Sequence, residues 1–131
     1  MGEVQGNIAK DIISFPNGMK TEQVFLNVIY SKELTGIKAD GVCGMAFNSL
    51  SDMYPTFIEN LYQTGQIDKK QFTFYLTLND RNDPRSELVI GGFDEAYTDE
   101  DFTFAPVIPR NGIYEFWLIN IDKILISQTP L

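Results

Sequence analysis

The segment ADGVCGMAF, residues 39–47, places the carboxylate of Asp40 in a glycine-rich apolar setting and holds the only Asp-Gly pair of the chain. A carboxylate placed in this way can act as a general acid in catalysis. Asp followed by Gly is equally typical of a turn, because both residues tolerate the backbone angles that turns require. The residue types around Asp40 leave both interpretations open.

Other catalytic chemistries are easier to exclude. The chain contains no histidine, which removes Ser-His-Asp and Cys-His catalysis as well as zinc sites with histidine ligands. Its one cysteine, Cys43, cannot form an internal disulfide, and no Lys or Arg stands beside it to lower the pKa of its thiol. We therefore expect Cys43 to be buried and unreactive.

A second acidic group consists of Asp94, Asp99, Glu100 and Asp101. These carboxylates could bind a cation, but their spacing differs from that of a calcium-binding loop such as the EF-hand. We expect a solvated acidic loop instead, and we predict neither a metal nor a cofactor for this chain.

The composition limits the class of protein and of partner. A length of 131 residues fits one domain, and the ten Phe and six Tyr suffice for a sizeable core. The formal charge of −8 argues against a nucleic-acid partner, which requires clustered Lys and Arg, and favours a role in solubility. No apolar run is long enough to span a membrane, and the first residues do not read as a signal peptide.

Most of the chain shows strand patterns. Apolar or alternating runs predict strands at residues 8–15, 21–30, 72–78, 87–90, 102–107 and 116–126. Pro16-Asn17-Gly18 joins the first two runs and predicts a hairpin, and the polar residues 79–84 predict a further turn. The chain is therefore expected to be mainly β, with antiparallel strands.

One helix interrupts the strands, and a second helical turn is weaker. Pro55 suits a first helical position, and Gly65 suits the residue that ends the helix. Phe57, Ile58, Leu61 and Tyr62 fall on one helical face and should be buried. Asp68 with Gln71 three residues later predicts a second, short turn with a capping box.

The order of motifs along the chain is specific. The segments are, in order, GEVQGNIAKDIISF, ADGVCGMAF, PTFIENLYQTGQI, FTFYLTL, SELVIGGFDEAYTDEDFTFAPV and FWLINIDKILI. Together they resemble the pepsin-like aspartic proteases from residue 2 to about residue 126. The resemblance implies that residues 1–131 form one partial peptidase domain of the bilobal fold. This part is the second half of the N-terminal lobe plus the strand crossing to the C-terminal lobe, with no separate second domain.

In that family each lobe supplies one catalytic aspartate from a D-T-G or D-S-G loop, and this chain contains neither motif. The resemblance implies a fragment of an aspartic endopeptidase that acts on peptides or proteins, with the remaining segments of both lobes supplied elsewhere. No catalytic residue is expected in the chain, and the isolated chain should be inactive. Secretory, vacuolar or lysosomal routing is implied. An inactive homologue that binds peptides or a protein is the alternative, and an unrelated β-domain is a third interpretation.

The resemblance also implies roles for individual residues. Met1 and Gly2 would be remnants of the flap, the hairpin that closes over the substrate. Ala39 and Val42 would line the non-primed pockets, with Ala39 leaving more room than a Phe, and Phe116 would border the primed side. Asp40, Gly41, Val42, Cys43 and Gly44 would support the active-site loop of the first lobe. For Val42 and Phe116, packing in the core is an equally good interpretation.

Overall fold

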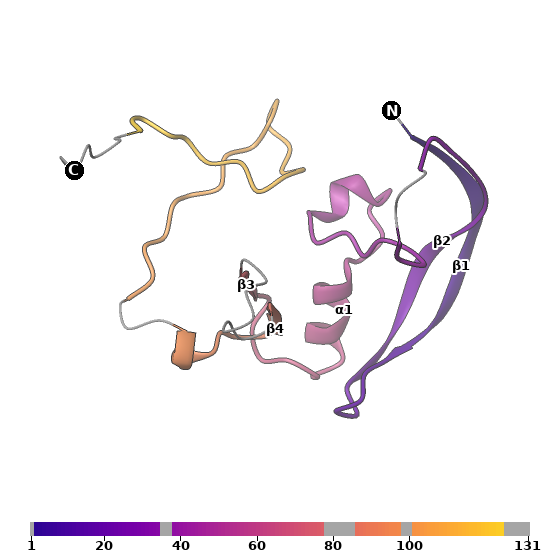
Figure 1. Cartoon of the computed structure of the whole chain (residues 1–131), viewed down its shortest axis with the longest axis horizontal. Helices are drawn as coiled ribbons and strands as arrows, with labels where there is room; N and C mark the ends of the chain where they lie inside the picture. Colours follow the sequence, from indigo (N-terminus) through magenta and orange to yellow (C-terminus); the bar gives the residue numbers. More distant parts are fainter. Residues whose placement is uncertain (1, 35–37, 78–85, 98–100, 125–131) are drawn as a thin grey trace.

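The computed structural model describes residues 2–34, 38–77, 86–97 and 101–124. A long antiparallel hairpin of β1 (Glu3–Ser14) and β2 (Lys20–Lys32) forms one side of the molecule (Figure 1). Both predicted strands are confirmed, and both extend further at the open end of the hairpin. The predicted turn is confirmed as well, since the Gly18 N–H donates to the Phe15 carbonyl at 3.0 Å.

A bulge bends the hairpin near its open end. Gln5 pairs with Tyr30, whereas Gly6 pairs with Val28, so Ile29 has no opposite residue. A Cβ atom at position 6 would lie 2.2 Å from the carbonyl oxygen of Asn27, so only glycine fits this close approach of the two strands.

The predicted helix is confirmed as α1 (Phe57–Gln63), but it begins later than expected. Thr56 is the N-cap, so Pro55 precedes the helix and does not occupy its first turn. The Thr56 hydroxyl accepts the Glu59 N–H at 3.3 Å, and the Glu59 carboxylate accepts the Thr56 N–H at 2.7 Å. This reciprocal capping box fixes the first residue of the helix.

The C-terminal end of α1 matches the prediction. Gly65 follows the C-cap with φ of +69°, and its N–H donates to the Tyr62 carbonyl. The N–H of Gln66 donates to the Leu61 carbonyl. Both bonds are those of a Schellman motif, which requires a left-handed residue at the glycine position. The second helical turn predicted at Asp68 is wrong, because residues 68–70 form only a bend.

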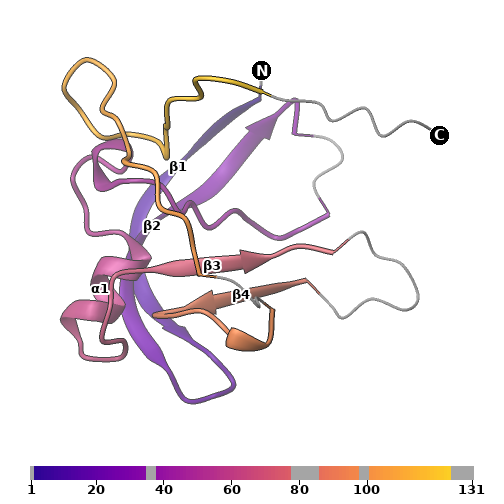
Figure 2. The ribbon, with the colours of Figure 1, turned by 90° about the vertical axis from the view of Figure 1, so that its left-hand side faces the viewer.

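The core is much smaller than the composition suggests. Among the described residues, the buried apolar side chains are Phe57, Ile58, Leu61 and Ile67. Three of these four lie on α1, which stands between the hairpin and the second sheet (Figures 1 and 2). Tyr62 was expected on the buried face, but it is exposed and lies 5.6 Å from the Lys70 ammonium, measured to its ring centre.

The second sheet pairs β3 (Phe72–Tyr75) with β4 (Glu87–Ile90), antiparallel and in the predicted order. β3 ends three residues earlier than expected, and the turn predicted at 79–84 lies outside the described residues. Two short 3₁₀ helices, η1 (Asn48–Leu50) and η2 (Glu95–Tyr97), complete the structure. The description as mainly β, with antiparallel strands and short helices, is confirmed.

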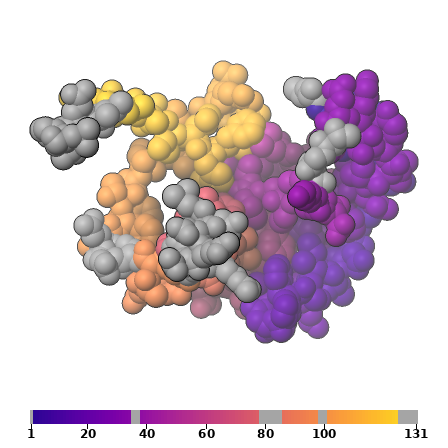
Figure 3. All heavy atoms as spheres, in the orientation of Figure 1, coloured from indigo at the N-terminus to yellow at the C-terminus, as the bar shows by residue number. Residues whose placement is uncertain are grey.

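Two predicted strands are wrong. Residues 102–107 form no strand, and neither do residues 116–124, while residues 125 and 126 lie outside the described part. A strand requires a partner for its backbone. Among the described residues, the one backbone hydrogen bond between either segment and another part of the chain runs from the Ile108 N–H to the Leu118 carbonyl. They run along the side of the molecule away from the hairpin (Figure 3). No helix of the described residues is long and apolar enough to cross a membrane.

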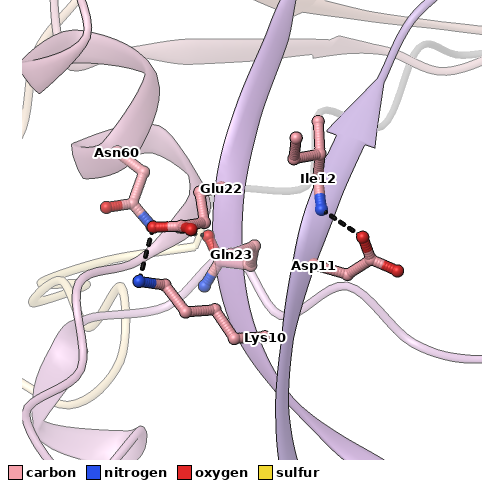
Figure 4. Close-up of polar contacts among 6 residues, drawn as sticks. All are labelled: Lys10, Asp11, Ile12, Glu22, Gln23 and Asn60. Carbon is pink, nitrogen blue, oxygen red and sulfur yellow. Dashed lines mark hydrogen bonds and ion pairs between the residues drawn. The ribbon is translucent and has the colours of Figure 1, made fainter.

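Polar side chains hold the hairpin against the helix (Figure 4). The Asn60 side chain of α1 donates to the Gln23 Oε1 of β2 at 2.8 Å, and Gln23 donates to the carbonyl of Pro55 at 3.2 Å. Lys10 and Glu22 form an ion pair across the hairpin at 2.5 Å. Both of these charged groups are exposed, so the pair adds little to stability, and Gln23 is the main polar link to the helix.

The first testable prediction concerns Thr21 of β2. It is 4% exposed, and its hydroxyl has no hydrogen-bond partner among the described residues. Because a buried hydroxyl without a partner is unfavourable, Thr21→Val should raise the free energy of unfolding by about 1 kcal/mol. Thr73→Val is the matched control, since the Thr73 hydroxyl donates to the Gly92 carbonyl and its removal should destabilise. Urea unfolding measures both, and destabilisation by Thr21→Val would contradict the prediction.

The capping box of α1 generates the second prediction. Thr56→Ala should lower the free energy of unfolding by about 1 kcal/mol, because the Glu59 N–H loses its acceptor. Thr56→Ser keeps the hydroxyl and should behave like the unaltered chain. Equal losses for the two variants would show that the methyl group of Thr56, and not its hydroxyl, stabilises the helix start.

Candidate functional site

Asp40 lies where a turn residue is expected. Residues 39 and 40 form a bend, and both are exposed. The segment continues from there without helix or strand as far as η1. The surroundings of Asp40 are therefore open to solvent, which favours the turn interpretation over that of a general acid in an apolar pocket.

Residues 41–44 line a groove of about 790 Å³ between this segment and β2. On the hairpin side the groove is lined mainly by apolar residues of β1 and β2, and on the other side by residues 50–52 and 54–57. The lining includes Ile8, Ile13, Val24, Phe25, Leu26, Leu50, Tyr54 and Phe57. Four of the five residues predicted to support an active-site loop therefore share this groove, namely Gly41, Val42, Cys43 and Gly44. Asp40 does not line it.

The C-terminal part of the segment is held by Trp117. The indole N–H of Trp117 donates to the Met45 carbonyl at 2.8 Å, and its ring lies 4.6 Å from that of Phe47 between ring centres. The Phe47 N–H also donates to the Glu115 carbonyl at 3.4 Å. Sequence reasoning identified the tryptophan only as part of a strand, because a pattern of alternating residues cannot show which distant backbone its side chain contacts.

A smaller cavity of about 200 Å³ lies beside this anchor, with Phe47, Phe72 and Trp117 among its walls. Phe72 lies 5.5 Å from Trp117 in an edge-to-face arrangement. Two residues of the cavity wall have ionisable side chains, Glu59 and Lys70. The Glu59 carboxylate is already occupied by the helix cap and by Asn48, so the cavity offers little unused polar chemistry.

Of the described residues predicted to bind substrate, Val42 lines the groove. Met1 lies outside the described residues, and Gly2 precedes β1 beside Leu34. Val42 borders the groove and is 85% exposed, whereas Ala39 lies in the preceding bend. Phe116 is 41% exposed and lies 5.1 Å from the Arg110 guanidinium, measured to the ring centre. Core packing within this chain therefore accounts for neither Val42 nor Phe116.

The expectation of a buried thiol at Cys43 is wrong, because the residue is exposed at the groove wall. Residues 41–44 are all exposed, so the apolar residues around Cys43 do not pack into a core. Neighbouring atoms still desolvate the sulfur in part, which raises the pKa of the Cys43 thiol above its ordinary value. A raised pKa lowers the thiolate fraction at neutral pH, so Cys43 is accessible but poorly nucleophilic.

In the acidic group of residues 94–101, Asp94 has a structural role. The Asp94 carboxylate accepts the Ala96 N–H at 2.8 Å at the start of η2. Asp99 and Glu100 lie outside the described residues, and the part of the chain that is described contains no group of three or more potential metal ligands. The hydroxyl of Tyr97 in η2 donates to the Glu87 carboxylate of β4, and this hydrogen bond, with some desolvation and the nearby negative charges, raises the pKa of Tyr97.

Comparison with known proteins decides the family. A sequence model of the eukaryotic aspartyl proteases matches residues 1–131. The chain belongs to this family. Cathepsin D of Gallus gallus is 30% identical over 130 residues, which cover 97% of this chain and 32% of that protein. Cathepsin D of Homo sapiens is 28% identical, covering 97% of this chain and 33% of that protein.

Pepsin B of Canis lupus familiaris shows a shorter match, 33% identical over 90 residues that cover 68% of this chain and 22% of that protein. The aspartyl-protease chain described here thus spans about a third of the length of the curated cathepsin D relatives it matches. Its groove segment, residues 39–47, lies within the matched region.

The third prediction concerns the reactivity of the Cys43 thiol. A maleimide should modify Cys43 in the folded chain, because the residue is exposed, but more slowly at neutral pH than it modifies free cysteine. The rate should rise with a midpoint above that of free cysteine, about pH 8.5, because the pKa is raised. The same chain unfolded in urea is the control and should react like free cysteine. A folded chain that reacts faster than free cysteine at neutral pH would contradict the assignment.

Proposed function

We propose that this chain works as part of an aspartic endopeptidase whose two catalytic aspartates lie in sequence outside residues 1–131. The observation that supports this most is the family match over residues 1–131 in a chain without any D-T-G or D-S-G motif. The share of about a third of the relatives' length agrees with a contribution to a larger unit.

The chemistry of the proposed enzyme requires two carboxylates that share a proton. Like charges at short distance cannot both ionise, so one aspartate stays protonated while the other activates a water molecule as a base. The protonated group then acts as the acid towards the peptide bond. Asp40 is a poor candidate for either part, because it lies in an exposed bend and lacks the hydroxyl residue that should follow it.

In this proposal residues 40–44 support the loop that carries one of the aspartates. Gly41 and Gly44 have no atom within 4 Å of the position that a Cβ would take, so another backbone can approach them closely. Val42 and the apolar wall of β2 would then cover one side of that backbone. Gly2, Ala39, Val42 and Phe116, together with Met1, remain candidates for contact with an extended peptide substrate.

The proposal generates the fourth prediction. The isolated chain should not cleave fluorogenic peptides at any pH from acidic to neutral, because it lacks both catalytic aspartates. Hydrolysis by this chain that is blocked by a transition-state mimic of the aspartate pair would contradict the proposal.

A substitution at Asp40 distinguishes a role in supporting the active-site loop from a catalytic role of this residue. In the longest natural polypeptide that contains residues 1–131, Asp40→Asn should change peptide hydrolysis by less than about 10-fold, whereas removal of a general acid costs about 100-fold or more.

A native polypeptide with the mass of this chain alone that binds peptides without hydrolysis would favour an inactive binding homologue instead.

A further inference from the structure

The chain contains two Asn-Gly pairs, Asn17-Gly18 and Asn111-Gly112. An asparagine that precedes glycine readily loses its side-chain amide, because glycine has no side chain that hinders its backbone nitrogen. This nitrogen attacks the side-chain carbonyl carbon of the asparagine, so both groups must be free to move toward each other. Both asparagines are exposed, so exposure does not distinguish between them, and their hydrogen bonds must.

Both reacting groups are held at Asn17, in the turn between β1 and β2. The Gly18 N–H, which belongs to the nucleophile, donates to the Phe15 carbonyl at 3.0 Å. The Asn17 Oδ1 accepts the Met19 N–H at 3.1 Å. The Phe15 N–H also donates to the Met19 carbonyl at 2.8 Å, and the ladder of β1 and β2 begins at the next residues. Ring closure at Asn17 therefore requires at least two hydrogen bonds to break.

These restraints are missing at Asn111. Arg110 and Ile113 form one antiparallel pair, and between them Asn111 and Gly112 have positive φ, 52° and 80°. This is the two-residue type I′ turn that Asn-Gly favours. In the part of the chain that the structure describes, neither the Asn111 side chain nor the Gly112 N–H has a hydrogen-bond partner. Both reacting groups are thus unengaged.

The turn at residues 110–113 also opens at lower cost than the hairpin turn. Its Arg110–Ile113 pair consists of two backbone hydrogen bonds, 2.9 and 3.0 Å long, and no described strand continues it. The next backbone bond between the flanking segments runs from the Ile108 N–H to the Leu118 carbonyl. Local opening is easiest where few backbone bonds act together. The turn is formed by four consecutive residues, so segments outside residues 1–131 are not needed to form it.

We propose that Asn111 is the residue at which this chain deamidates spontaneously, in preference to Asn17. The Gly112 nitrogen forms a bond to Cγ of Asn111, and the bond from Cγ to the amide nitrogen breaks. Ammonia leaves and takes up the proton of the Gly112 N–H. Water then opens the resulting succinimide ring at either carbonyl and gives aspartate or isoaspartate. No group is oxidised or reduced, and water is the one additional reactant.

The products change the turn in two ways. Either carboxylate adds one negative charge to a chain whose formal charge is −8, and it follows Arg110, whose guanidinium already pairs with Glu115 at 2.6 Å. Isoaspartate in addition places its Cβ in the main chain, so the turn gains one backbone atom. The Arg110–Ile113 pair then cannot keep the geometry of a two-residue turn. The modified chain is therefore more acidic, and its isoaspartate form is locally opened.

Peptide mapping of the folded full chain by mass spectrometry, over a time course at mildly alkaline pH, tests this inference. Digestion at mildly acidic pH prevents further reaction. The mass increase from amide to acid should accumulate at Asn111 at least about 10-fold faster than at Asn17, where hydrogen bonds must break first. Isomerisation at Asp40-Gly41 leaves the mass unchanged and does not contribute. The chain unfolded in urea is the control, and there the preference should largely disappear because both asparagines precede glycine.

Two matched variants assign the acidic form of the folded chain that ion-exchange chromatography separates. Asn111→Gln should remove the early acidic form, because the longer side chain of glutamine closes a ring much more slowly. Asn17→Gln should leave this form unchanged. The inference is overturned by a smaller preference for Asn111, by a faster reaction at Asn17 or another asparagine, or by a preference that urea does not alter. An early acidic form that survives Asn111→Gln overturns it as well.

Discussion

The burial of one short helix is the constraint on which the described structure depends. α1 has seven residues, too few for a stable isolated helix, and an isolated two-stranded hairpin is likewise marginal in water. Each therefore requires the other. Leu61 is fully buried between them, and Phe57 and Ile58 flank it. The hydrogen bonds of Gln23 with Asn60 and Pro55 fix how the hairpin lies on the helix, which in turn places β2 opposite residues 41–44.

Turns, helix ends and short strands could be predicted from residues that are close together in the sequence. The turn at Asn17-Gly18, the glycine after α1 and the strand before Gly91 are encoded by residues within a few positions, and the structure contains each of them. The helix begins after the residue that Pro55 predicts, because the reciprocal Thr56–Glu59 capping box is a stronger start signal than the proline. Backbone geometry and side-chain capping act over one turn, so a short window of sequence records them.

Long-range features were not predictable in this way. Residues 116–124 have the composition of a strand, but a strand also requires a ladder of backbone hydrogen bonds, and the described residues provide a single bond to another segment, from the Ile108 N–H to the Leu118 carbonyl. The same reason explains Cys43, whose apolar neighbours in sequence suggested burial while its neighbours in space leave it exposed. For the groove, the motif ADGVCGMAF indicated which residues belong together, but not that β2 forms the facing wall.

Trp117 has a practical consequence for any solution study of this chain. It is the only tryptophan, it is 54% exposed, and its ring contacts those of Phe47 and Phe72. Its fluorescence therefore reports whether residues 115–118 remain attached to the segment at 45–47. An emission change without loss of the circular dichroism signal would mark the detachment of this part of the chain, an opening separate from unfolding of the hairpin and helix.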